Sequence, residues 1–154
     1  MGAAFFYHLT RSPVEETLPM LLDKSRQAGW RILIRGRDEN RLRWLDERLW
    51  QGAPEGFLPH GLAGGPHDAL QPVLLGGEGV SAEGFTCLMS IDGADLSAEE
   101  VQASERACIL FDGTDPDAVA HARVQWKALT DAGCAAKYWS QEEGPWAMKA
   151  EAGG

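Results

Sequence analysis

The sequence has few cysteines, a shortage of positive charge and no long apolar run. Its three cysteines lie far apart, and none belongs to a Cys-x-x-Cys or Cys/His pattern, so neither a disulfide framework nor a metal site is predicted. They are interpreted as buried thiols in a reducing compartment. No apolar run approaches the roughly 18 residues of a membrane span, and the N-terminal residues do not resemble a signal peptide. We therefore expect a cytoplasmic protein that does not contact a membrane.

The charge balance argues against one large class of function. The chain has 14 Lys and Arg against 23 Asp and Glu, a formal net charge of −9 at pH 7. Binding to a nucleic-acid backbone requires clustered Lys and Arg, so no direct contact with nucleic acid is expected. A small basic site for an acidic peptide remains compatible with this composition.

The length of 154 residues suits one domain. Apolar runs predict strands, and capping or 3.6-residue patterns predict helices beginning after Ser12, after Asp38 and after Asp115. The expected strands lie at 4–7, 30–35, 72–75, 85–91, 107–111 and 134–139. Their alternation with helices predicts a layered α/β domain over 1–140, with a mostly parallel central sheet flanked by helices. The residues expected at its centre are Ile32, Leu33, Ile34, Leu88, Ile109 and Leu110. A long loop is expected at 51–71, and a frayed tail at 141–154.

A parallel α/β sheet raises the alternative of a nucleotide-dependent enzyme. Residues 77–82, GEGVSA, fit G-x-G-x-x-[G/A] after a strand, but that fingerprint requires a helix to open there. Another strand is expected a few residues later, which favours a Gly-rich turn and no nucleotide site. His60 and His67 share a loop without a third ligand nearby, and no P-loop, G-x-S-x-G or H-E-x-x-H occurs. No catalytic residue, metal or cofactor is predicted.

The last predicted helix carries a more specific pattern. Arg123, Trp126 and Lys127 stand at i, i+3 and i+4, which places them on one helical face. Two cations flanking an indole form a local site for an acidic partner that ends in an aromatic residue or a carboxylate. The alternative, equally open from the spacing, is that Trp126 packs inward while the cations stay solvated.

A second aromatic stretch, LWQGAPEGFLPHGLAG, follows the second predicted helix. Trp50 and Phe57 lie among several Gly and Pro residues, where a surface turn is expected. Two rigid aromatics on such a turn offer a large apolar area, which is typical of a docking patch. Otherwise both rings would fold back under the loop and join the core.

Several segments together resemble the chi subunit of bacterial DNA polymerase III. They agree in order and spacing, and the most specific is LDERLW followed by FLPHGLAG. The full set is FFYHL, GWRILIRGRDEN, RLRWLDERLW, GFLPHGLAG, CLMSID, ACILFDG and ARVQWKALTDAG. The resemblance implies a Rossmann-like fold without a nucleotide site or catalysis of its own. It also implies a place in the clamp-loader assembly, between the psi subunit and the acidic tail of the single-stranded DNA-binding protein (SSB), which ends in Phe.

The resemblance also suggests residues for each partner. Trp50 and Phe57 match the psi-facing surface, which a helicase can share, and Arg123, Trp126 and Lys127 match the SSB-tail site. Many relatives have more arginine along this helix, where the present chain has Gln125 and Asp131. Asp131 would repel an acidic tail, and Lys24 and Arg26 of the first helix are candidates to compensate.

Overall fold

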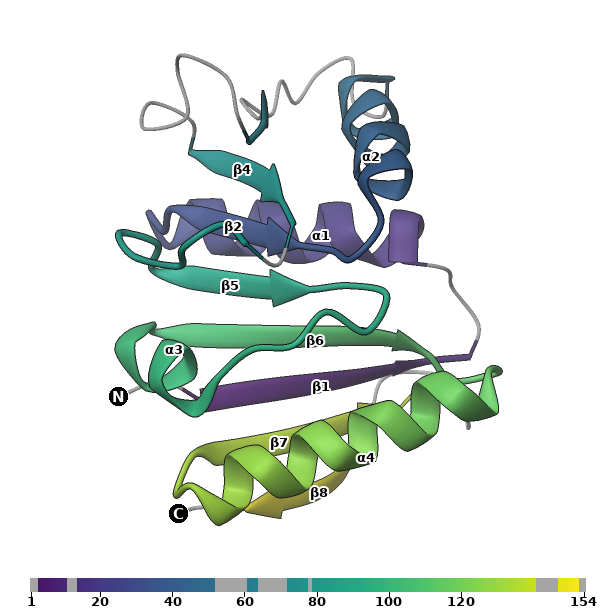
Figure 1. Cartoon of the computed structure of the whole chain (residues 1–154), viewed down its shortest axis with the longest axis vertical. Coiled ribbons are helices and arrows are strands. Elements are labelled where there is room, and N and C mark those ends of the chain that lie inside the picture. The colour runs from purple at the N-terminus through teal and green to yellow at the C-terminus, as the bar shows by residue number, and fades with distance from the viewer. Residues whose placement is uncertain are drawn as a thin grey trace.

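A computed structural model describes residues 3–10, 14–51, 61–63, 72–77, 79–140 and 147–152 of the chain. Eight strands form one sheet in the order β3-β4-β2-β5-β6-β1-β7-β8 (Figure 1). Every neighbouring pair is parallel except β7–β8, which confirms the predicted, mostly parallel α/β sheet. The strands are β1 Ala3–Leu9, β2 Ile32–Arg35, β3 Gly61–Leu62, β4 Val73–Gly76, β5 Cys87–Ser90, β6 Arg106–Asp112, β7 Ala135–Ser140 and β8 Ala147–Ala152. The helices are α1 Val14–Gln27, α2 Glu39–Gln51, α3 Ala98–Ala103 and α4 Pro116–Asp131.

The central strands are apolar throughout because both of their faces are covered. All six residues predicted at the centre of the sheet are at most 1% exposed. Alternate residues of one strand enter different layers: Ile32 and Ile34 belong to one hydrophobic cluster and Leu33 to the other.

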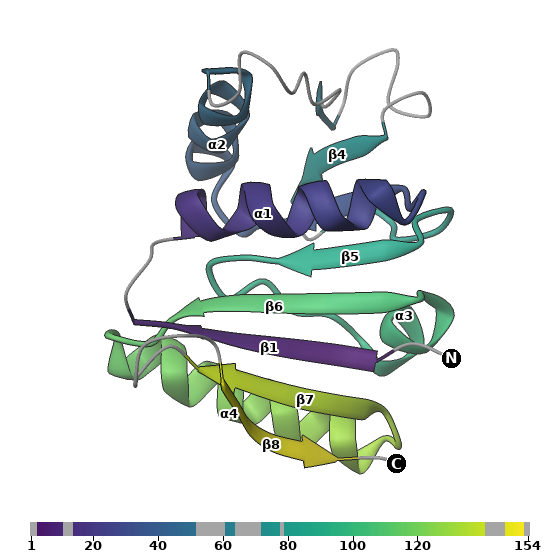
Figure 2. The ribbon, with the colours of Figure 1, turned by 180° about the vertical axis from the view of Figure 1, so that it is seen from behind.

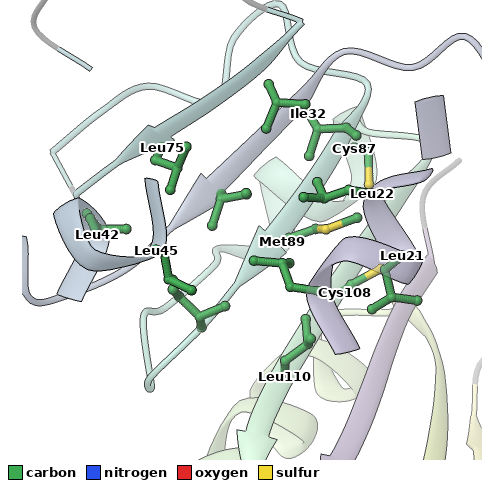
Figure 3. Close-up of a cluster of buried hydrophobic side chains, with 14 of the residues drawn as sticks. Leu21, Leu22, Ile32, Leu42, Leu45, Leu75, Cys87, Met89, Cys108 and Leu110 are labelled. Atoms are coloured by element: carbon green, nitrogen blue, oxygen red, sulfur yellow. The ribbon is translucent and has the colours of Figure 1, made fainter. Parts of the chain in front are cut away.

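Helices α1 and α2 cover one face of the sheet, and α3 and α4 cover the other (Figures 1 and 2). On the first face, Leu22 and Leu45 pack with Met89 and Cys108 of the neighbouring strands (Figure 3). All three cysteines are free and buried, as expected from their spacing. No helix in the described part of the chain is long and apolar enough to cross a bilayer.

The C-terminal segment differs from the expected frayed tail. Residues Ala147–Ala152 form β8, which pairs antiparallel with β7 at the edge of the sheet. A Lys137–Glu151 ion pair of 3.6 Å links the two strands. The segment is short and has weak alternation, so its extended conformation depends on the edge that β7 offers rather than on a local signal.

Helix α3 and the two-residue strand β3 were also not anticipated. α3 is a single short helix begun by a capping box, in which Ser97 and Glu100 satisfy each other's backbone N–H groups. β3 lies within the range expected to be a long loop and pairs with β4.

Candidate protein-docking site

Helix α4 presents the predicted cations to solvent. Ala122, Gln125 and Leu129 form its buried stripe, so the opposite side of the helix faces away from the sheet. Arg123 and Lys127 lie on that outer side, one turn apart, and both are exposed. The helix runs along one end of the molecule, where it lies in front of β7 and β8 in Figure 1.

Trp126 occupies the boundary between this surface and the core. Its side chain is partly buried and meets Phe6 edge-on at 5.3 Å between ring centroids. Tyr138 lies 6.0 Å away on the same side. Much of the indole therefore packs inward, as in the second alternative for this helix, while the two cations remain solvated.

Val124 adds an apolar group that the sequence interpretation missed. It is 65% exposed, and it is one of three large apolar side chains exposed among the described residues. Because it stands three residues before Lys127, it lies beside Lys127 on the outer side of the helix. The sequence already indicated this exposure, because Val124 does not fall on the 3.6-residue repeat that places the buried residues of α4.

Gln125 and Asp131, the two positions at which this helix lacks the expected arginines, lie on different sides of it. Gln125 is 7% exposed, and its side-chain amide donates a 3.1 Å hydrogen bond to the Ala94 carbonyl, so it lies off the outer face. Asp131 is on the outer face, with its carboxylate 2.9 Å from the Lys127 ammonium. Among these departures, Asp131 is therefore the one that bears directly on the cations.

A cluster of aromatic rings supports α4 on the side of the helix that faces the sheet. Tyr138 donates a 2.7 Å hydrogen bond to His8 Nδ1, and His8 Nε2 donates to the Gly113 carbonyl at 3.3 Å. A Cβ on Gly113 would overlap the imidazole ring of His8, so this close approach requires glycine. The packed rings hold Trp126 in place and so determine which way the outer face of α4 points.

The glycine-rich turn at 77–82 does not have the context of a nucleotide fingerprint. In its described residues the chain forms a turn and irregular structure, and the next regular element is β5. The Val80 carbonyl accepts a 2.9 Å hydrogen bond from Arg35 Nη2, and the same guanidinium forms a 2.7 Å ion pair with Glu100. The hydrogen bonds from Arg35 lower the pKa of Glu100 to about 2. This pair ties the turn to α3, and no helix begins at Gly79 to receive a phosphate.

The other two predicted docking residues, Trp50 and Phe57, lie largely outside the described part of the chain. Phe57 lies outside the described residues, as does the side chain of Trp50, whose backbone belongs to the last turn of α2. Earlier in the same helix, Trp44 is 38% exposed, with the Arg41 and Arg48 guanidinium carbons 4.7 and 5.3 Å from its ring centroid.

The first helix does not supply the cations suggested for the α4 site. Lys24 and Arg26 belong to the last turn of α1, which covers the opposite face of the sheet from α4 (Figure 2). Arg26 is also engaged locally, because its Nη1 donates a 2.7 Å hydrogen bond to the Trp30 carbonyl.

Comparison with known proteins gives one family and one fold. The family model for the DNA polymerase III chi subunit, HolC, matches residues 1–137. The sequence has no significant match among curated proteins. Among solved structures, the C-terminal domain of a possible DNA helicase from Lactobacillus plantarum WCFS1 is similar, with a TM-score of 0.51 and 11% identity over 73% of this chain and 75% of that one. At such low identity, the structural likeness concerns the fold alone.

Proposed function

The chain belongs to the DNA polymerase III chi subunit family, and from this premise we propose that it links the clamp loader to SSB-coated DNA. Family membership makes it an accessory subunit of that polymerase. The finer proposal is that one surface binds psi and another binds the acidic tail of SSB. In this role the chain contributes binding surfaces and no catalysis of its own.

The observation that carries the tail site is the outer face of α4. Arg123 and Lys127 are exposed cations, and Val124 between them is an exposed apolar side chain, in a protein with a net charge of −9. A guanidinium can grip a carboxylate through two parallel hydrogen bonds, and an ammonium acts as a point charge for a second acid. The outer edge of Trp126, three residues after Arg123, then offers apolar area to a terminal Phe.

The psi site is proposed at the end of α2 and the loop that follows. Trp50 and Phe57 match the family's psi-facing positions, and a helicase is the alternative occupant of the same surface. Support for the arrangement comes from geometry: α2 lies at the end of the molecule remote from α4 (Figure 1). An adaptor requires such separation, because both partners must bind at once.

The test of the tail site is a titration with an acidic peptide ending in Phe, followed by calorimetry. Lys127→Ala should weaken binding by about 0.2–1 kcal/mol, the usual range for an exposed ion pair. Lys127→Glu should cost more, because it adds repulsion. Raised salt should weaken the wild-type complex, since exposed charges are screened within about 8 Å at physiological ionic strength. Deleting the peptide's Phe should weaken it at every salt concentration.

The matched control reverses a charge elsewhere. Arg43 is exposed on α2, at the far end of the molecule, so Arg43→Glu should leave tail affinity unchanged. Equal peptide affinity for wild type and for the Arg123→Ala, Lys127→Glu double variant would show that the site is wrongly placed. Absence of wild-type binding at low salt would refute the tail-binding role.

A further inference from the structure

Asp131 stands where helix electrostatics disfavour an acid. It is the last residue of α4, and the last turn of that helix contains no basic residue. The C-terminal end of a helix carries partial negative charge from its unpaired carbonyl groups, so a carboxylate there is repelled. The contribution of Asp131 to the helix itself therefore does not account for its presence.

The side chain of Asp131 contacts a residue of the tail site. Its Oδ2 atom lies 2.9 Å from Lys127 Nζ, one turn earlier on the same face, with the two side chains 63% and 78% exposed. In a helix, an acid four residues before a cation is the more stabilising order, and here the order is reversed. The pair thus contributes little to stability, but it occupies the ammonium group that the tail site needs.

We propose that Asp131 is a built-in competitor for the tail site, whose carboxylate occupies the Lys127 ammonium until an incoming carboxylate displaces it. This inference rests on the proposed function and describes how that site is tuned. The bound peptide must replace the internal ion pair as well as overcome the nearby negative charge. Asp131 therefore lowers affinity and speeds release of the acidic partner, while Arg123, one turn before Lys127, stays available for the first contact.

The test is a double-mutant cycle on the full chain, with a fluorescent acidic peptide ending in Phe as the probe. Asp131→Asn should raise affinity about two- to fivefold at low salt, because an exposed ion pair is weak enough to be displaced and a repulsive charge is also removed. In the Lys127→Gln background the same substitution should give a clearly smaller gain, because only the repulsion between Asp131 and the peptide is then removed. Asp131→Ala should behave as Asp131→Asn does, which excludes a new contact from the amide.

The control removes a carboxylate from the same helix without touching Lys127. Asp117 is exposed in the first turn of α4, so Asp117→Asn lowers the net negative charge equally, and it should leave affinity unchanged. Thermal unfolding of each variant checks the fold, and Asp131→Asn should be at least as stable as wild type because the unfavourable interaction with the helix dipole is removed.

The outcomes separate this inference from the function on which it rests. If wild type binds the peptide and Asp131→Asn binds it no more tightly, the competitor role is refuted while the tail site stands. An equal gain with and without Lys127 would also refute it, since Asp131 would then act as a general negative charge. If neither wild type nor Asp131→Asn binds at low salt, the tail site and the competitor role are both refuted.

Discussion

At the scale of single residues, Arg35 carries the most consequential contacts. Its side chain is only 4% exposed, and its two terminal nitrogens bind the two Glu100 oxygens at 2.9 and 2.7 Å. They also donate to the carbonyls of Asp95 at 3.1 Å and Val80 at 2.9 Å. One guanidinium therefore holds together the end of β2, the glycine-rich turn and the start of α3.

Replacing Glu100 by Gln should destabilise the protein by about 2–4 kcal/mol at pH 7, because a buried cation then faces a neutral partner. The pKa of Glu100 is lowered from 4.5 to about 2 in the folded protein, so its stabilising contribution is complete above about pH 4.5 and is lost as the pH falls toward 2. The difference between wild type and variant should therefore shrink over that range. Urea denaturation at several pH values between 7 and 2.5 measures it.

The control for this prediction is Glu39→Gln on α2. Glu39 pairs with Arg43 at 3.8 Å, and both side chains are more than half exposed. Such a pair contributes little, so the change should stay within about 0.5 kcal/mol at every pH. Parallel loss of stability in wild type and Glu100→Gln on acidification would contradict the role assigned to the buried pair.

At the scale of elements, α4 determines how the candidate tail site is presented. Its first turn is capped by the Asp115 side chain, which accepts a 2.9 Å hydrogen bond from the Asp117 backbone N–H, and Pro116 occupies the first helical position. It ends before Gly133, whose φ of 90° suits glycine. Local signals thus set both ends, and packing sets its rotation.

Asp115→Ala should cost about 1 kcal/mol of stability, because one backbone donor at the start of α4 loses its partner. Tail affinity should be unchanged, since the binding residues lie in later turns of the helix. Chemical denaturation and peptide titration of the same variant measure the two quantities. Asp117→Ala is the comparison: it removes only a favourable dipole interaction and should cost a few tenths of a kcal/mol. Equal losses in both variants would argue against the cap.

At the scale of the whole molecule, the sheet keeps the two proposed surfaces apart. α2 packs on one face beside β3 and β4, whereas α4 packs on the other face beside β6, β1 and β7. The views from both sides show the two helices at opposite ends (Figures 1 and 2). Binding at one surface therefore need not disturb the other.

We expect the two surfaces to respond independently to mutation. Phe57→Ala should weaken binding of psi, or of a helicase on the same surface, by about 2 kcal/mol if Phe57 is a hot spot, and should leave tail affinity unchanged. Lys127→Glu should do the reverse. Titrating psi in the presence of saturating tail peptide provides a second measure, and a shift in psi affinity of more than about 0.5 kcal/mol would contradict independence.

The sequence by itself determined the elements with strong local signals. The continuous apolar run in β6 predicts a strand covered on both faces, and the Asp115–Pro116 pair predicts where α4 begins. The 3.6-residue period also places Arg123 and Lys127 together. These conclusions depend only on neighbours along the chain, so they could be reached without knowledge of the fold.

Only the tertiary structure decided the features that depend on distant partners. Trp126 turns inward because Phe6 and Tyr138, from strands in other parts of the chain, provide its ring contacts. The pairing of Arg35 with Glu100 and the extended form of β8 likewise require elements that are remote in sequence or placed by the sheet. No local pattern specifies such contacts, because their free energy is gained only once the sheet has brought the partners together.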